Sequence, residues 1–151
     1  MGASPATLKT IIDEVRGCFW VLKTVSDEAI ADLGLTASTR AILQYLRENG
    51  AQAVPKIAAD KSVKRQSIQA LVDQLLNDGR VETRPNPAHQ RSQLIALTPA
   101  GEAVFQEVLR REQEILSGLG EKLDRSGMEA IAEHLALFRQ ALLNIREKDD
   151  D

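Results

Sequence analysis

The stretch Val63–Phe105 reads VKRQSIQALVDQLLNDGRVETRPNPAHQRSQLIALTPAGEAVF, and its hydrophobic pattern changes twice along its length. In the first part apolar residues recur at spacings of three and four, which predicts an amphipathic helix from about Lys64 to Asn77. Gly79 is the expected stop, because glycine readily adopts the left-handed conformation that ends many helices. The side chains expected to face inward are Ile68, Leu71, Val72, Leu75 and Leu76.

The second part of the stretch alternates apolar and polar residues and predicts a hairpin. Two short strands are expected at Val81–Arg84 and Gln93–Leu97, with the Pro-rich tip Pro85–Ser92 between them. Thr98 is a favoured N-cap residue and Pro99 a favoured first helical residue. We therefore expect a long helix to begin directly after the hairpin.

Upstream residues complete the pattern of a small DNA-binding domain. Thr36 predicts the cap of a helix over about 37–48, and a shorter helix is expected near 55–60. A tight connection at 61–63 would join it to the helix after Val63. Residues 36–98 are therefore expected to form a winged helix-turn-helix domain, whose second helix can lie in the major groove of DNA.

The residue types on the expected DNA-binding face suit this function. Arginine can recognise guanine and glutamine can recognise adenine, each through two hydrogen bonds. The wing tip, stiffened by Pro85 and Pro87, would present Arg91 to the narrow minor groove, and Lys61 and Ser62 would lie near phosphates. The predicted DNA-contacting residues are Ser62, Lys64, Arg65, Gln66, Ser67, Gln69, Arg84, His89, Gln90 and Arg91.

The two ends of the chain predict long helices outside this domain. One is expected over 6–32, with Gly34 as its stop, and the chain after Thr98 is expected to be helical with a break around 118–127. Because helices this long are most readily buried against a second copy, we expect residues 1–35 and 99–151 to form a helical dimerisation region. The expected dimer contacts are Leu8, Ile11, Val15, Ile131, Leu135, Phe138, Leu142 and Ile145.

Two features of the C-terminal part carry further expectations. The sequence SGME at Ser126–Glu129 has the pattern of a capping box and predicts the start of the last helix. The acidic tail Asp149–Asp151 is expected to fray.

Composition limits the class of protein and its surroundings. The net charge is -3, yet residues 54–98 hold seven basic and four acidic side chains, a basic centre in an acidic chain that suits phosphate binding. A random fluctuation of surface charge would give the same pattern. One cysteine excludes an internal disulfide, and neither a signal peptide nor a long apolar span is visible, so we expect a soluble cytoplasmic protein without membrane contact.

The stretch from Val63 to Phe105 resembles the MarR (multiple antibiotic resistance regulator) family of bacterial transcription regulators. The matching elements are Val63–Gln66, Leu71–Leu75, Gly79–Val81, Arg84–Arg91 and Leu97–Gly101. The resemblance implies a mainly α fold with a small two- or three-stranded β wing and long dimerisation helices. It also implies a homodimeric, sequence-specific regulator of an inverted-repeat operator, most often a repressor, that a small ligand or cysteine oxidation releases.

Four positions depart from the family pattern, and one of them is Arg80, which replaces a usually apolar residue. His89 and Gln90 replace the usual Asp and first Arg of the wing, and a neutral His89 cannot support the wing arginine as a carboxylate does. Lys64 replaces a serine cap whose loss costs about 1 kcal/mol, and it adds a charge that a phosphate can use.

Four residues are candidates for a small-ligand site. Arg16, Phe19, Trp20 and Tyr45 are expected near the place where the family holds its effectors, and aromatic walls with a cation suit an aromatic acid. Ordinary helix packing is the alternative.

Cys18 has two interpretations. It lies on the apolar stripe of the first helix, where a thiol packs as a small hydrophobic group, and some family members sense oxidants through a cysteine in that helix.

No metal-ligand spacing, cofactor motif or catalytic constellation is visible, so we expect a protein that is not an enzyme and has neither metal nor cofactor. Two other functions stay open. One is a winged-helix adaptor between proteins that has lost DNA binding, and the other is a small enzyme that uses Cys18 or a histidine.

Overall fold

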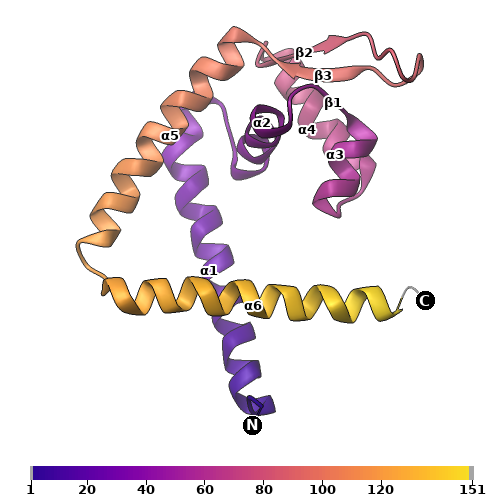
Figure 1. Cartoon of the computed structure of the whole chain (residues 1–151). Coiled ribbons are helices and arrows are strands. Elements are labelled where there is room, and N and C mark those ends of the chain that lie inside the picture. Colours follow the sequence, from indigo (N-terminus) through magenta and orange to yellow (C-terminus); the bar gives the residue numbers. More distant parts are fainter. Residues whose placement is uncertain (1, 150–151) are drawn as a thin grey trace. The chain divides into compact units, whose positions relative to one another are not determined.

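The structure, a computed structural model, describes residues 2–149 and divides into a unit up to Leu109 and a unit from Arg110 onward. Figure 1 shows the elements in chain order. They are α1 (Pro5–Ile30), the short 3-10 helix η1 (Ala31–Leu33), α2 (Ala37–Asn49), β1 (Gln52–Ala53), α3 (Val54–Lys61), α4 (Arg65–Asn77), β2 (Val81–Arg84), β3 (Leu94–Leu97), α5 (Pro99–Gly120) and α6 (Arg125–Asp149). The predicted mainly α fold with a small β wing is confirmed. Of the acidic tail predicted to fray, Asp149 is the last residue of α6, and residues 150 and 151 lie outside the described residues.

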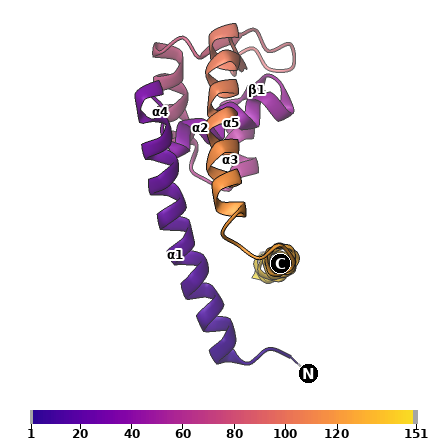
Figure 2. The ribbon, with the colours of Figure 1, turned by 90° about the vertical axis from the view of Figure 1, so that its left-hand side faces the viewer.

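Local signals define both ends of α1. The Ser4 hydroxyl accepts a hydrogen bond from the Thr7 amide at 3.1 Å, and Pro5 occupies the first turn, where its missing N–H costs nothing. After η1, Gly34 has a φ of 72° and its N–H binds the Ala31 carbonyl, so the predicted stop is confirmed. Figure 2 shows the N-terminal half of α1 extending away from α2, α3 and α4.

The start of α2 is a complete capping box. Thr36 accepts from the Thr39 amide at 3.2 Å, and Thr39 accepts from the Thr36 amide at 2.8 Å. Thr39 is fully buried, and these bonds satisfy its hydroxyl. The sequence predicted Thr36 as the cap, and the structure adds Thr39 as its reciprocal partner.

The sheet has three antiparallel strands in the order β1-β3-β2. The wing hairpin pairs Val81 with Leu97 and Arg84 with Leu94, as the alternating pattern predicted. The third strand, β1, pairs Gln52 with Ile95. It is two residues long, too short for an alternating pattern to show in the sequence.

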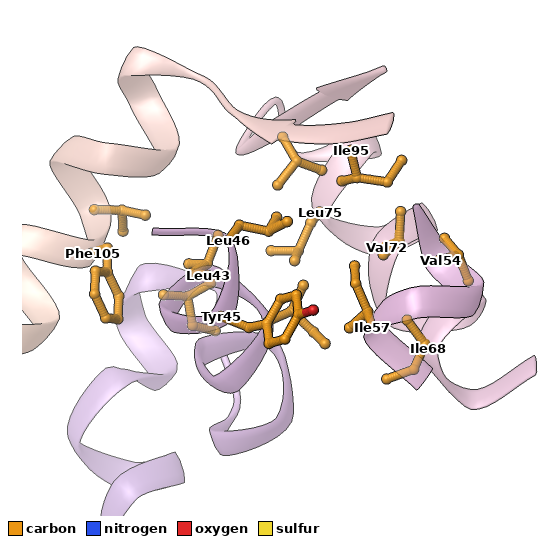
Figure 3. Close-up of a cluster of buried hydrophobic side chains, with 14 of the residues drawn as sticks. Leu43, Tyr45, Leu46, Val54, Ile57, Ile68, Val72, Leu75, Ile95 and Phe105 are labelled. Carbon is orange, nitrogen blue, oxygen red and sulfur yellow. The ribbon is translucent and has the colours of Figure 1, made fainter. Parts of the chain in front are cut away.

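The core lies among α2, α3, α4 and the sheet, and Figure 3 shows ten of its side chains with labels. It is aliphatic except for Tyr45 and Phe105, in agreement with the low aromatic content. It also includes Ile30 from the end of α1 and Val104, Phe105 and Val108 from the first half of α5. The winged fold is therefore completed by side chains from outside residues 36–98.

Phe105 receives two cations from α2. The guanidinium groups of Arg40 and Arg47 lie 5.7 and 5.5 Å from its ring centroid, and Arg47 also pairs with Glu102 at 3.3 Å. These contacts hold the first half of α5 against α2.

The start of α6 differs from its prediction. The helix begins at Arg125, and the Gly127 amide donates to the Asp124 carboxylate at 2.7 Å. Asp124 is therefore the capping residue and the predicted cap at Ser126 is wrong, because Ser126 lies inside the first turn and its hydroxyl donates to Asp124.

Candidate nucleic-acid interface

A tight turn joins α3 to α4. Ser62 has a φ of 54°, a left-handed conformation that is uncommon outside glycine. Its N–H donates to the Ala59 carbonyl at 3.1 Å, and the Val63 N–H donates to Ala58 at 3.1 Å. These bonds close the end of α3, and α4 begins directly afterwards. The tight connection predicted at 61–63 is therefore present.

The N-terminal face of α4 is open to solvent. Ile68, Val72 and Leu75 point into the core, so the opposite side of the helix is exposed. The predicted contact residues on this side, all exposed, are Lys64, Arg65, Gln66, Ser67 and Gln69.

Lys64 occupies the N-cap of α4 and makes no capping hydrogen bond with its side chain. The first amides of α4 therefore keep donors available to a bound anion, and the helix dipole favours negative charge at this end. The charges of Lys64 and Arg65 add to that preference.

Asp73 is a member of this face that the sequence reasoning did not assign a role. Its carboxylate accepts a hydrogen bond from the Gln69 amide nitrogen at 2.7 Å, one turn away on the exposed side. The contact fixes the orientation of Gln69 while leaving its carbonyl oxygen and a second N–H for other partners. The spacing of four residues was the available signal.

The two arginines of the wing differ in whether they are paired with a carboxylate. Arg84, at the end of β2, is bound to Glu82 through Nε and Nη2 at 3.0 and 2.8 Å. Arg91, at the tip, makes no hydrogen bond or ion pair with any residue from 2 to 149. Its neighbours His89 and Gln90 are also exposed, and together they line a shallow hollow at the tip.

The tip has a local hydrogen-bonded turn. The Asn86 side chain accepts from the Ala88 amide at 3.1 Å, and the Asn86 carbonyl accepts from the His89 amide at 3.2 Å. Arg91 is therefore presented from a shaped turn with its guanidinium unpaired, whereas the charge of Arg84 is already matched.

Tyr45 lies in the core and not beside the aromatic residues of α1. Its hydroxyl donates to the Asp60 carboxylate at 2.6 Å, and the Lys61 ammonium lies 5.7 Å from its ring centroid. Burial, followed by the hydrogen bond and charge of Asp60, raises the pKa of the Tyr45 hydroxyl to about 12. Lys56, at 2.7 Å, and then Tyr45 lower the pKa of Asp60. Tyr45 thus fixes α3 on α2, and its place in a ligand site stays a prediction.

The remaining candidates for the ligand site lie on α1. Phe19 and Trp20 form an edge-to-face pair with centroids 5.4 Å apart, and both are well exposed, as is Arg16. Cys18 is also exposed in the single chain, so the structure does not bury its thiol within this chain as the packing interpretation expected.

The predicted dimer contacts are mostly uncovered in one chain. On α1, Leu8 and Ile11 are half-buried and Val15 is exposed; on α6, Phe138 is half-buried. The other predicted contacts on α6 are exposed: Ile131, Leu135, Leu142 and Ile145. Trp20 and Val21 add exposed apolar area to α1 beyond the predicted dimer contacts.

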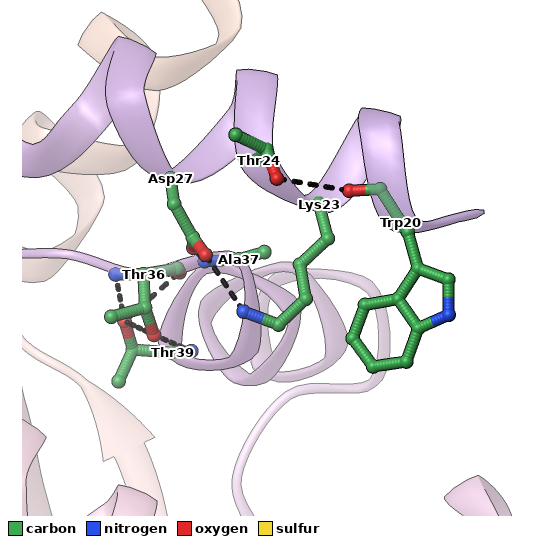
Figure 4. A network of polar contacts seen from close by, with 7 residues as sticks. All are labelled: Trp20, Lys23, Thr24, Asp27, Thr36, Ala37 and Thr39. Atoms are coloured by element: carbon green, nitrogen blue, oxygen red, sulfur yellow. Dashed lines mark hydrogen bonds and ion pairs between the residues drawn. The ribbon is translucent and has the colours of Figure 1, made fainter. Parts of the chain in front are cut away.

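A carboxylate connects α1 to the start of α2, as Figure 4 shows. Asp27 accepts a hydrogen bond from the Ala37 amide at 2.5 Å and pairs with Lys23 at 2.7 Å. The Ala37 amide and then Lys23 lower the pKa of the Asp27 carboxyl group. Asp27 carries no local signal, since its partner amide lies ten residues away in the sequence.

The arrangement of α2, α3, α4 and the three-stranded sheet is that of a winged helix-turn-helix protein. The chain has the fold of MarR family transcription regulators. The solved structure of a MarR family transcription regulator, SP03579, superposes with a TM-score of 0.85 over 94% of both chains at 23% identity. A MarR family protein from Bacillus stearothermophilus superposes with a TM-score of 0.78 over 94% of this chain and 99% of that one, at 20% identity.

Two sequence relatives share more identity with this chain than these structures do, but they cover less of it. An uncharacterised protein of Mycobacterium tuberculosis is 32% identical over 92 residues, which are 61% of this chain and 64%, less than two thirds, of that protein. The transcriptional activatory protein BadR of Rhodopseudomonas palustris is 28% identical over 137 residues, covering 88% of this chain and 77% of BadR. No family model matches the chain.

None of the helices within residues 2–149 combines the length and apolar content needed to cross a bilayer.

Proposed function

We propose that the chain is a DNA-binding transcription regulator that works as a homodimer on an inverted-repeat operator. The observation that carries the proposal is the pairing of two exposed cationic elements on one winged unit. These are the uncapped start of α4, with Lys64 and Arg65, and the wing tip, with the unpaired Arg91. The structural likeness to MarR regulators and the name of BadR support the same function.

Each element has a distinct role in this proposal. Gln66 and Gln69 of α4 read base edges in the major groove, whereas Ser62, Lys64 and Ser67 bind phosphates. Arg91, flanked by His89 and Gln90, enters the minor groove beside the site that α4 occupies. Arg84 contributes less, because binding DNA would require it to leave Glu82.

Residues 36–98 form the DNA-binding domain and the flanking helices form the dimer. Two copies place their α4 helices about one helical turn of DNA apart, which is what an inverted repeat requires. The exposed apolar side chains of α1 and α6 supply the surface that a second copy would bury.

Regulation follows from a change in the spacing of the two winged units. A small aromatic acid at the exposed Arg16, Phe19 and Trp20 would release the DNA if it bound one spacing better than the other. Oxidation of the exposed Cys18 is a second route to the same change. Repression is the proposed outcome of binding over a promoter, although BadR is named an activatory protein.

The test is binding to the duplex upstream of the chain's own gene, measured by fluorescence anisotropy across a salt series. We expect log affinity to fall steeply and linearly with log salt, at about 0.9 per phosphate contact. Arg91→Ala should weaken binding to all duplexes and reduce that slope by about two in the dimer, one per copy. Arg125→Ala, which removes an equal charge at the start of α6, is the matched control and should leave the slope unchanged.

Base reading is tested separately from charge. Gln66→Ala and Gln69→Ala should alter the preferred operator bases more than the affinity for non-specific duplex. A wild-type chain with no salt-sensitive affinity for duplex would instead favour the adaptor between proteins.

A further inference from the structure

The end of α4, the two strands of the wing and the first turn of α5 meet at one joint, made of Gly79, Arg80, Thr98 and Gly101. Gly79 has a φ of 69°, and its N–H donates to Leu76 at 3.1 Å. The Arg80 N–H donates to Leu75 at 2.9 Å, which completes a paired closure of the helix. β2 begins at the next residue, so the end of α4 and the base of the wing share this backbone.

Thr98 binds both sides of the joint with one hydroxyl. Its Oγ1 donates to the Gly79 carbonyl at 2.7 Å and accepts from the Gly101 amide at 3.0 Å. Its backbone N–H donates to the Arg80 carbonyl at 3.2 Å, which extends the β2–β3 ladder by one bond. The N-cap of α5 is therefore also the anchor of the C-terminus of α4.

Gly101 is required by space and not by backbone conformation. A Cβ atom at this position would lie 1.9 Å from the Arg80 carbonyl oxygen and 2.9 Å from the Arg80 carbonyl carbon. Both are backbone atoms, so neither can turn away as a flexible side chain could. The first turn of α5 thus lies directly against the residue that precedes the wing.

We propose that Thr98 and Gly101 are positioning residues that hold the wing and the end of α4 at a fixed angle on α5. They set where Arg91 reaches when α4 occupies its groove, so this inference rests on the proposed function. Because α5 continues beyond Leu109 to Gly120, a rotation of its first turn carries both DNA-contacting elements together. Neither residue touches DNA in this account.

The test compares Thr98→Val, which keeps the shape and removes the hydroxyl, with Thr98→Ser, which keeps the hydroxyl. In the free protein, Thr98→Val should speed amide hydrogen exchange selectively over residues 80–97, and Thr98→Ser should restore the wild-type pattern. Thr36→Val is the matched control, because it removes the capping hydroxyl of α2 and should leave this selective increase absent.

DNA binding provides the second readout. Thr98→Val should weaken duplex binding about five- to tenfold, as expected for the loss of one or two hydrogen bonds. In an Arg91→Ala background the same change should cost less than twofold, since the wing tip no longer contributes. Gly101→Ala should speed amide hydrogen exchange in the hairpin more than Thr98→Val does, because the added Cβ atom would push the Arg80 backbone away.

Two results would overturn the inference, and they can be told apart. If Thr98→Val leaves hairpin exchange unchanged, or weakens binding equally in both backgrounds, the joint does not position the wing and the proposed function is untouched. If the wild-type chain binds no duplex, the proposed function fails, and the positioning role fails with it.

Discussion

The winged part of the chain and its long terminal helices use apolar residues in opposite ways. In the winged part, Leu43, Ile57, Val72 and Leu75 are 0% exposed. In the middle of α1, four consecutive apolar residues, 19–22, are 59–64% exposed. The first region is covered by its own side chains, whereas the second leaves a large apolar area for another surface to cover.

The same contrast holds for α6. Over residues 125–145 every side chain is at least partly exposed, although apolar residues recur at helical spacing. Contiguous apolar surface of this kind is uncommon on isolated soluble chains and is typical of an interface. The core of the winged part is thus buried within one chain, whereas the apolar faces of α1 and α6 stay uncovered and match the proposed dimer.

The largest effect is expected from disrupting the exposed apolar side of α6. Leu135→Asp places a charge on the exposed apolar side of α6, where the proposed dimer would bury it twice. We expect monomers by light scattering after size exclusion, and a loss of operator affinity of at least about a hundredfold because the half-sites become independent. Gln140→Asp, at a polar position of the same helix, should leave the dimer intact. A dimeric Leu135→Asp variant would show that α6 is not at the interface.

The next effect separates the two regions by their dependence on concentration. Leu75→Ala opens a cavity in the winged core and should lower the free energy of unfolding by about 2–5 kcal/mol. Leu22→Ala removes an exposed side chain and should lower the melting temperature by an amount that depends on protein concentration, because dimers are stabilised by mass action. Melting both variants over a hundredfold range of concentration tests the contrast. If the effects of the two substitutions on melting temperature depended equally on concentration, the contrast between the two regions would be wrong.

A smaller effect is expected in the winged part, at the start of α4. Lys64→Ser supplies the missing cap of α4 and should raise the free energy of unfolding by about 1 kcal/mol in urea titrations. The same change should weaken duplex binding, since it removes a charge at the uncapped helix end. Lys122→Ser, in the turn before α6, is the control and should change neither quantity. Unchanged duplex binding by Lys64→Ser would remove Lys64 from the DNA-binding face.

The smallest expected effect lies at the link between the regions, where Asp27 joins α1 to Ala37. The pKa of Asp27 is lowered in the folded chain, so its contribution to stability is present above its unfolded pKa and is lost as pH falls through the lowered value. The difference in urea midpoint between wild type and Asp27→Asn should therefore be largest near neutral pH and should vanish in strong acid. Asp13→Asn, at an exposed pair on α1, should show a smaller difference. A difference that grows on acidification would contradict the link.

The sequence by itself determined the order and type of the main elements, because their signals are short-range. The helical spacing of Ile68, Val72 and Leu75, the cap at Thr36 and the stop at Gly34 each act within a few residues. The exposed set on α4 followed from the same periodicity. These features could be predicted because neighbouring residues on one helix or strand settle them.

Only the tertiary structure decided which distant groups meet. β1 pairs with β3, which lies far along the sequence. The Tyr45 hydroxyl binds Asp60 of another helix. Only glycine fits at position 101, because a Cβ atom there would clash with the Arg80 carbonyl oxygen. None of these has a local signature, since each depends on where packing brings two separate segments. The cap of α6 was misplaced for a related reason: Asp124 and Ser126 both suit a helix start, and the backbone geometry of the turn selects Asp124.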